Sequence, residues 1–207
     1  MNIELLSFMM KVIIICFSLI GLYYKSGLSE KGFKKISFIY FTNLNLVFSL
    51  IYFVLAIFIY NNKLLNGING FIILSSIITM TVYLFLLVPK HQKIGENYKL
   101  FSLSDIIVHY VVPLLVILNW LIFTTKGNFT YYYPFLWAIP FLIYFFAIVI
   151  RAHYGGLLFG KTRYPYYFID LDKIGVKKAM KNLIIFSSMI IILGYILFFL
   201  DLFLNIF

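Results

Sequence analysis

Six long apolar stretches are the feature that most limits how this 207-residue chain can fold. They cover residues 5–24, 37–60, 70–89, 105–125, 134–150 and 182–204. Each is close to the ~20 residues that an α-helix needs to cross a hydrocarbon layer about 30 Å thick. The apolar residues form runs rather than the alternation typical of membrane β-barrel strands. We therefore expect an all-α integral membrane protein, with a single bundle of six transmembrane helices in one domain over residues 1–207.

Composition agrees with this expectation and argues against several other classes of protein. The chain is 63% hydrophobic and 12% charged, whereas soluble domains are about 25% charged. The formal net charge of +10 does not indicate nucleic acid, because the basic residues lie between apolar stretches and form no binding face. The single cysteine, Cys16, excludes an intramolecular disulfide and a cysteine metal cluster. The first stretch, interrupted by Lys11 and followed by no small-residue cleavage site, is expected to remain as a helix rather than to be a signal peptide.

The distribution of Lys and Arg predicts how the helices are oriented. Fourteen of the 17 basic residues follow the first, third and fifth stretches: Lys25, Lys31, Lys34, Lys35, Lys90, Lys93, Lys99, Arg151, Lys161, Arg163, Lys173, Lys177, Lys178 and Lys181. The opposite connections hold only Lys63 and Lys126. The positive-inside rule therefore predicts a multi-pass protein with its basic loops in the cytoplasm and both termini on the opposite side.

Two polar side chains lie near the starts of the second and fourth stretches. Thr42 comes five residues after Ser37, and His109 four residues after Asp105. At ~1.5 Å per residue both lie roughly 6–8 Å inside their helices. Because these two helices run in the same direction, the hydroxyl and the imidazole can meet, as a nucleophile and its base must. The structural alternative is that Thr42 is an interhelical hydrogen-bonding group.

The surroundings of His109 also carry information. Asp105 lies one turn before it and fits either a helix N-terminus or a hydrogen bond to the imidazole. Pro113 cannot donate a backbone hydrogen bond to the His109 carbonyl, so we expect a kinked helix beside the imidazole. An ionisable side chain within a membrane helix is functional by default, which favours a catalytic role for His109.

Further polar residues are candidates for substrate contacts. The amides of Asn43 and Asn45 could donate to an oxyanion or pair helices together. Arg151, at the end of the fifth stretch, could hold a carboxylate or phosphate or anchor the helix at the interface. The aromatic segment with Tyr164 and Tyr166 could cover a site or lie in the aromatic belt of the membrane.

No metal site or cofactor is predicted. His91 and His153 belong to separate connections, and no carboxylate cluster joins them. Metal sites usually gather three or four such side chains around one ion.

Short motifs add a family resemblance to this interpretation. They are YFTNLN at residues 40–45, HYVVP at 109–113, NW at 119–120 and YPYYFID at 164–170. In this order they resemble the androgen-induced and androgen-dependent TFPI-regulating proteins, with their bacterial and rolling-stone-like relatives. The resemblance implies a multi-pass membrane hydrolase that uses Thr42 as nucleophile and His109 as its partner, without a cofactor, on fatty acid esters of hydroxy fatty acids or similar acyl lipids.

Other functions stay open at the level of sequence. A small transporter would place acidic residues near the middle of its helices, whereas those here lie at helix ends, as Asp201 does. A non-enzymatic scaffold could use the same polar groups to hold helices together. For an enzyme, both hydrolysis and acyl transfer remain alternatives, and the sequence does not determine the oligomeric state.

Overall fold

Most of the part of the chain that the structure describes is helical. The computed structural model describes residues 2–29, 32–59, 62–90, 101–158 and 162–206. Within these ranges six helices are long and apolar enough to cross a membrane, and the only β-contact is an isolated bridge between Leu158 and Thr162. The prediction of an all-α, six-helix membrane protein is confirmed.

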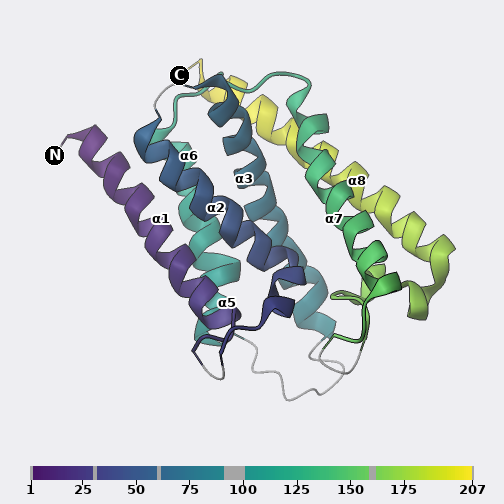
Figure 1. Cartoon of the computed structure of the whole chain (residues 1–207). Coiled ribbons are helices and arrows are strands. Elements are labelled where there is room, and N and C mark those ends of the chain that lie inside the picture. Colours follow the sequence, from purple (N-terminus) through teal and green to yellow (C-terminus); the bar gives the residue numbers. More distant parts are fainter. Residues whose placement is uncertain (1, 30–31, 60–61, 91–100, 159–161, 207) are drawn as a thin grey trace. The chain divides into compact units, whose positions relative to one another are not determined.

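The helices follow the chain in a simple order (Figure 1). The α-helices are α1 (Ile3–Lys25), α2 (Phe41–Phe58), α3 (Lys63–Val82), α5 (Leu103–Ile106), α6 (Val112–Phe123), α7 (Tyr133–Tyr154) and α8 (Leu171–Leu204). Two π-helical turns continue this pattern: η2 (Tyr83–Leu87) extends α3, and η3 (Ile107–Val111) joins α5 to α6. The segments η1 (Lys35–Ile39) and η4 (Tyr167–Ile169) are short 3₁₀ helices.

Three helix starts differ from the sequence prediction, each for a local reason. Residues expected to open the second helix form η1, so α2 begins at Phe41 rather than at 37. The Asn62 side chain accepts from Leu64 and Leu65 N–H groups, so α3 begins at Lys63 rather than at 70. The last helix begins at Leu171 rather than at 182 and has a kink at Gly175, where φ is 75° and ψ is 160°; polar residues on both sides of the kink precede the apolar stretch. Apolar runs mark membrane-spanning lengths, not helix ends.

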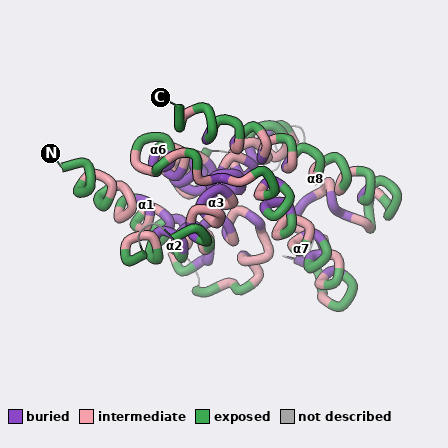
Figure 2. Tube along the Cα trace, turned by 90° about the horizontal axis from the view of Figure 1, so that it is seen from above, coloured by how far each residue is buried: buried purple, intermediate pink, exposed green. Residues whose placement is uncertain are grey.

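The first of two compact units comprises Met1–Phe129 and Leu202–Phe207. In it α1 packs against α2 and α6, α2 against α3, and α3 against α6. Buried residues concentrate around α3 (Figure 2), while much of α1 is exposed. Exposed apolar side chains on these helices suit contact with lipid tails. The centre of this unit is therefore the region where polar side chains can be kept away from lipid.

Two kinds of contact hold this unit together. Asn45 joins α2 to α3, because its Oδ1 accepts from Ser75 Oγ at 2.6 Å and its Nδ2 donates to Ser76 Oγ at 3.5 Å. Gly21 lets α1 approach closely, since a Cβ there would lie 2.9 Å from Val108 Cγ1. Small residues and interhelical hydrogen bonds are the usual means by which membrane helices associate.

The second unit comprises Thr130–Asp201, with α7, η4 and most of α8. Gly194 of α8 packs against Pro134 of α7, where a Cβ would lie 3.0 Å from the proline ring. Asn182 Nδ2 donates to the Phe168 carbonyl at 2.8 Å and fixes the segment before α8 to this helix. The prediction of one domain over residues 1–207 stays a prediction.

The predicted orientation also stays a prediction. Lys31, Lys93, Lys99 and Lys161, which contribute to the charge count, lie outside the described residues, as does His91.

Candidate active site

Thr42 and His109 lie next to each other in the first unit. Thr42 Oγ1 is 3.4 Å from His109 Nε2. His109 is 5% exposed and Thr42 is half-buried, so the imidazole is the more enclosed of the two residues. The two side chains meet, as the sequence predicted.

The contact was predicted from equal depths of the two residues in their helices, and this reason is wrong. Thr42 is the second residue of α2, not the sixth, because Lys35–Ile39 form the separate helix η1. His109 is the seventh residue of the helical span that begins at Leu103. Equal depth counted from the helix starts therefore does not explain the contact; the packing of η3 against α2 does.

Thr42 also lies at a helix N-terminus. The Tyr40 carbonyl accepts from the N–H groups of Asn43 and Leu44 and opens α2. The backbone N–H of Thr42, also in this first turn, makes no hydrogen bond to a described residue, and the helix dipole adds positive potential there. Burial raises the pKa of the Tyr40 phenol above its usual value, so this neighbour stays neutral. The start of α2 can therefore stabilise negative charge beside the Thr42 hydroxyl.

The second ring nitrogen of His109 determines its tautomer. Nδ1 lies 3.1 Å from the backbone carbonyl of Asp105. A carbonyl oxygen can only accept, so Nδ1 carries the proton and donates it to Asp105. In the neutral imidazole, Nε2 then has a free lone pair, and this nitrogen is the one that faces Thr42. The geometry is that of a hydroxyl beside a general base.

Asp105 is fixed through its other groups. Its backbone N–H donates to Ser102 Oγ at 3.3 Å, which is ordinary N-cap chemistry. Its carboxylate, 1% exposed, pairs with Lys25 at the end of α1. Both interpretations of Asp105 from the sequence therefore apply, with the contact to His109 made by its carbonyl rather than by its carboxylate.

The His109 imidazole also contacts an aromatic ring and lies in a widened helical turn. The Tyr83 ring stacks on the imidazole with centroids 3.9 Å apart and planes at 18°. Both rings belong to π-helical turns, Tyr83 to η2 and His109 to η3. Beside the imidazole, where a kink is predicted, the helix forms the π-helical turn η3. Such turns are often found at functional sites.

The two asparagines are engaged in protein contacts. Asn43 Nδ2 donates to the Ser37 carbonyl at 2.7 Å and ties η1 to α2. Asn45 Nδ2 donates to Ser76 in α3. Both amides are buried. Their contacts favour the helix-pairing interpretation, while their role as oxyanion donors stays untested.

Arg151, Tyr164 and Tyr166 belong to the second unit. Arg151 Nη1 donates to the Arg163 carbonyl at 3.0 Å and so fastens the end of α7 to the following loop. Tyr164 and Tyr166 are buried rather than spread along an interface. Burial, followed by the negative charges of Asp172 and Asp170, raises the pKa of the Tyr164 phenol. Their assignment as substrate-binding residues remains a prediction.

Lys25 and Tyr83 were missed by the sequence interpretation. Lys25 was counted only as a loop charge, and Tyr83 only as part of an apolar stretch. A lysine directly after an apolar run could have suggested a partner for an acidic helix end, but no local pattern links Lys25 to a residue 80 positions away.

Within the described ranges, no group of three His, Cys, Asp or Glu side chains lies close enough to hold a metal ion. Comparison with known proteins adds no relative to this description. No protein-family model, curated protein or solved structure matches this chain.

Proposed function

We propose that this protein is an intramembrane lipid esterase in which Thr42 is the nucleophile and His109 is its base. The observation that carries the proposal is the alignment of the imidazole. Nδ1–H is occupied by the Asp105 carbonyl, and Nε2 lies 3.4 Å from the Thr42 hydroxyl. This distance is long for a hydrogen bond, as is common for catalytic pairs without substrate.

The first half of the reaction is acyl transfer to the protein. Thr42 Oγ1 attacks the ester carbonyl carbon while Nε2 takes the hydroxyl proton. Negative charge on the carbonyl oxygen is stabilised by the backbone N–H of Thr42 and by the dipole at the start of α2. The tetrahedral intermediate then releases the alcohol, which receives the proton from Nε2, and leaves an acyl ester on Thr42.

The second half regenerates the hydroxyl. A water molecule attacks the acyl ester while Nε2 accepts one of its protons. Collapse of this intermediate returns the proton to Thr42 Oγ1 and releases the fatty acid. The Asp105 carbonyl keeps Nδ1–H in place and stabilises the imidazolium at each proton transfer. If a second lipid alcohol replaces water, the same steps give acyl transfer.

The setting suits a lipid substrate. Exposed apolar side chains cover the outer faces of these helices, which suits lipid tails, and Thr42 is only partly buried beside them. The sequence resemblance points to fatty acid esters of hydroxy fatty acids or similar acyl lipids as the substrate class.

The proposal is tested by labelling detergent-purified protein with a fluorophosphonate probe and mapping the adduct. We expect the adduct on Thr42, with the label lost in His109→Gln, where no base remains. Thr81 is the matched control, because its hydroxyl donates to the Ile77 carbonyl of its own helix at 2.8 Å. An adduct on Thr81, or full labelling of His109→Gln, would refute the threonine mechanism.

A further inference from the structure

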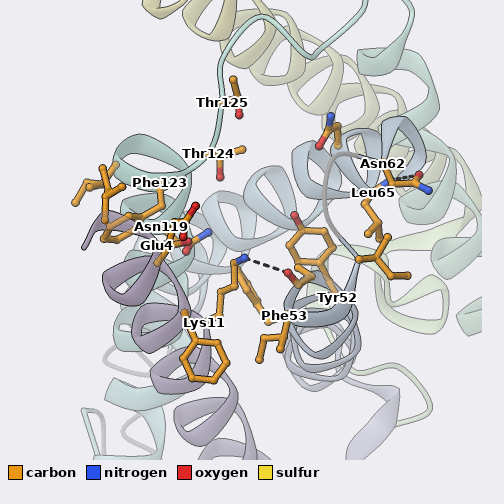
Figure 3. Close-up of a pocket in the computed structure, with 18 residues that line it drawn as sticks. Glu4, Lys11, Tyr52, Phe53, Asn62, Leu65, Asn119, Phe123, Thr124 and Thr125 are labelled. Carbon is orange, nitrogen blue, oxygen red and sulfur yellow. Dashed lines mark hydrogen bonds between the residues drawn. The ribbon is translucent and has the colours of Figure 1, made fainter. Parts of the chain in front are cut away.

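A pocket of about 490 Å³ lies in the first unit, at the end of the helices away from Thr42. It is lined by the first turns of α1 and α3 and by the last turns of α2 and α6 (Figure 3). Its volume falls within the about 300–1,000 Å³ of typical ligand pockets. One part of its wall is apolar and includes Phe53 and Phe123, while another part carries hydrogen-bonding groups.

Lys11 is the cation in this pocket. It lies in the middle of α1, a helix of membrane-spanning length. Its ammonium donates to the Ala56 carbonyl of α2 at 3.0 Å, and this is the one hydrogen bond that it makes to described residues. An ammonium has three donors, so two remain for a ligand. A charge at this position in a membrane helix is costly and indicates function.

Asn119 and Tyr52 add uncharged polar groups to the same pocket. Asn119 is 3% exposed, and its Oδ1 has no hydrogen-bond partner. A buried acceptor without a partner costs about 1–3 kcal/mol, so this oxygen is suited to a donor supplied from within the pocket. The Tyr52 hydroxyl makes no hydrogen bond to another described residue and can donate alongside Lys11.

The three groups lie at comparable depth. Lys11 is eight residues into α1, Tyr52 six residues before the end of α2, and Asn119 four residues before the end of α6. At ~1.5 Å per residue this is roughly 6–12 Å inside the helices. Glu4 lies two helical turns from Lys11, at the first turn of α1, and is exposed.

We infer that this pocket binds the head of an amphiphile in which a phosphate or carboxylate lies next to a hydroxyl. The anionic oxygens accept from Lys11 and Tyr52, and the hydroxyl donates to Asn119 Oδ1. A second hydroxyl can donate to Glu4 at the exposed end. The apolar wall accommodates the beginning of an acyl chain. The proposed ligand therefore contacts both the polar and the apolar residues that line the pocket.

Lys11 could instead serve only to cap the C-terminus of α2, because a lysine near the last carbonyls of a helix is favourable. That role explains the contact with Ala56 but not the unpartnered Asn119 Oδ1. It also predicts a different experimental result, since a cap affects stability without making the protein selective for a head group.

The test measures thermal unfolding of the purified full-length protein in mixed micelles. Phosphatidylglycerol, which carries a phosphate and hydroxyls, is titrated against phosphatidylcholine, which has the phosphate without a donor. Glycerol 1-phosphate tests whether the head binds without chains. The variants are Lys11→Met, Asn119→Leu and Tyr52→Phe. Lys63→Met is the matched control, since this cation lies at the start of α3 and does not line the pocket.

We expect phosphatidylglycerol to raise the unfolding temperature at a mole fraction about tenfold lower than phosphatidylcholine does. Asn119→Leu should abolish this difference, because only phosphatidylglycerol has a hydroxyl to donate there. Lys11→Met should weaken stabilisation by both lipids, because both carry the phosphate, while Lys63→Met should keep both effects. Stabilisation by glycerol 1-phosphate would identify a soluble ligand, and stabilisation by the lipid alone a membrane one. Equal effects of the two lipids on the unmodified protein, unchanged selectivity in Asn119→Leu, or an unchanged response to phosphatidylglycerol in Lys11→Met would overturn the inference. Should Lys11→Met fail to fold, Tyr52→Phe removes one hydroxyl only, and an unchanged response to phosphatidylglycerol there would overturn it equally.

Discussion

The two ends of the first unit use their polar residues in opposite ways. At the start of α2, Asp105 and His109 are each held by other parts of the protein. At the far end, Lys11 keeps donors free and Asn119 Oδ1 has no partner, and both line a pocket. A catalytic site requires side chains that the protein already holds in position. A binding site requires side chains whose hydrogen-bonding groups are free to contact a ligand. The contrast therefore agrees with our proposals of catalysis at one end and recognition at the other.

The largest expected effect is on the catalytic end. Thr42→Val keeps the shape of the side chain but removes the attacking oxygen, so lipid-ester hydrolysis should fall roughly 10³-fold or more. Thr42→Ser keeps the oxygen and should retain a measurable rate. The measurement is fatty acid release from a branched lipid ester by purified protein.

Thr81→Val is the matched control for this loss and should hydrolyse normally. If Thr42 only joins helices, Val would cost about 0.6 kcal/mol of stability without a categorical loss of activity. A folded and fully active Thr42→Val protein would therefore refute the proposal that the end of the unit with Thr42 is the catalytic one.

The next largest effect is expected on the free energy of unfolding, through the ion pair at the proposed catalytic end. Asp105→Asn and Lys25→Met each break an ion pair whose carboxylate is buried. Each should lower the free energy of unfolding by about 1–3 kcal/mol. The double variant should lose less than the sum, because the two residues act on each other. Thermal unfolding in detergent measures this, and strictly additive losses would show that the pair does not couple α1 to α5.

A substitution at Gly21 should lower the free energy of unfolding by a similar amount, through a steric clash. A Cβ there would meet Val108, the neighbour of His109, at 2.9 Å. Gly21→Val should therefore destabilise the protein by about 1–3 kcal/mol and slow hydrolysis through displacement of η3. Gly156→Val is the control, since a Cβ there meets nothing within 4 Å. An unaffected Gly21→Val protein would mean that α1 can move away from η3 without cost.

The smallest effect is expected at Asn45. Its amide joins Ser75 and Ser76 between the two ends. Asn45→Leu should cost about 0.6 kcal/mol, and at most about 1.7 kcal/mol, with hydrolysis nearly unchanged. A loss of rate at unchanged unfolding temperature would instead favour the predicted oxyanion role.

Much of the fold could be predicted from sequence, because membrane-spanning length is a property of a continuous apolar run. The contact between Thr42 and His109 was predicted as well, although the start of α2 was wrong. Helix starts depend on side-chain caps such as that of Asn62 and on 3₁₀ segments such as Lys35–Ile39. A hydropathy profile predicts neither side-chain caps nor 3₁₀ segments.

Two other contacts between distant segments could not be predicted from the sequence. Lys25 pairs with Asp105, and Tyr83 stacks on His109, through the packing of helices rather than through local spacing. The far pocket was missed for a similar reason. Lys11, Tyr52 and Asn119 lie on three different helices, and each alone suggests an anchor, a belt residue or a helix-pairing group.

The widened turns η2 and η3 also determine the rotational phase of the helices that follow them. A π-helical turn accommodates about one extra residue, which amounts to about 100° of rotation about the helix axis. Tyr83 and His109 both lie in such turns and face each other. A chain that lost one residue from Ile107–Val111 would turn its imidazole away from α2 while its hydropathy profile hardly changed. When distant relatives are aligned, a one-residue gap beside the histidine is therefore a sign that this pairing has been lost, even where all six apolar stretches still match.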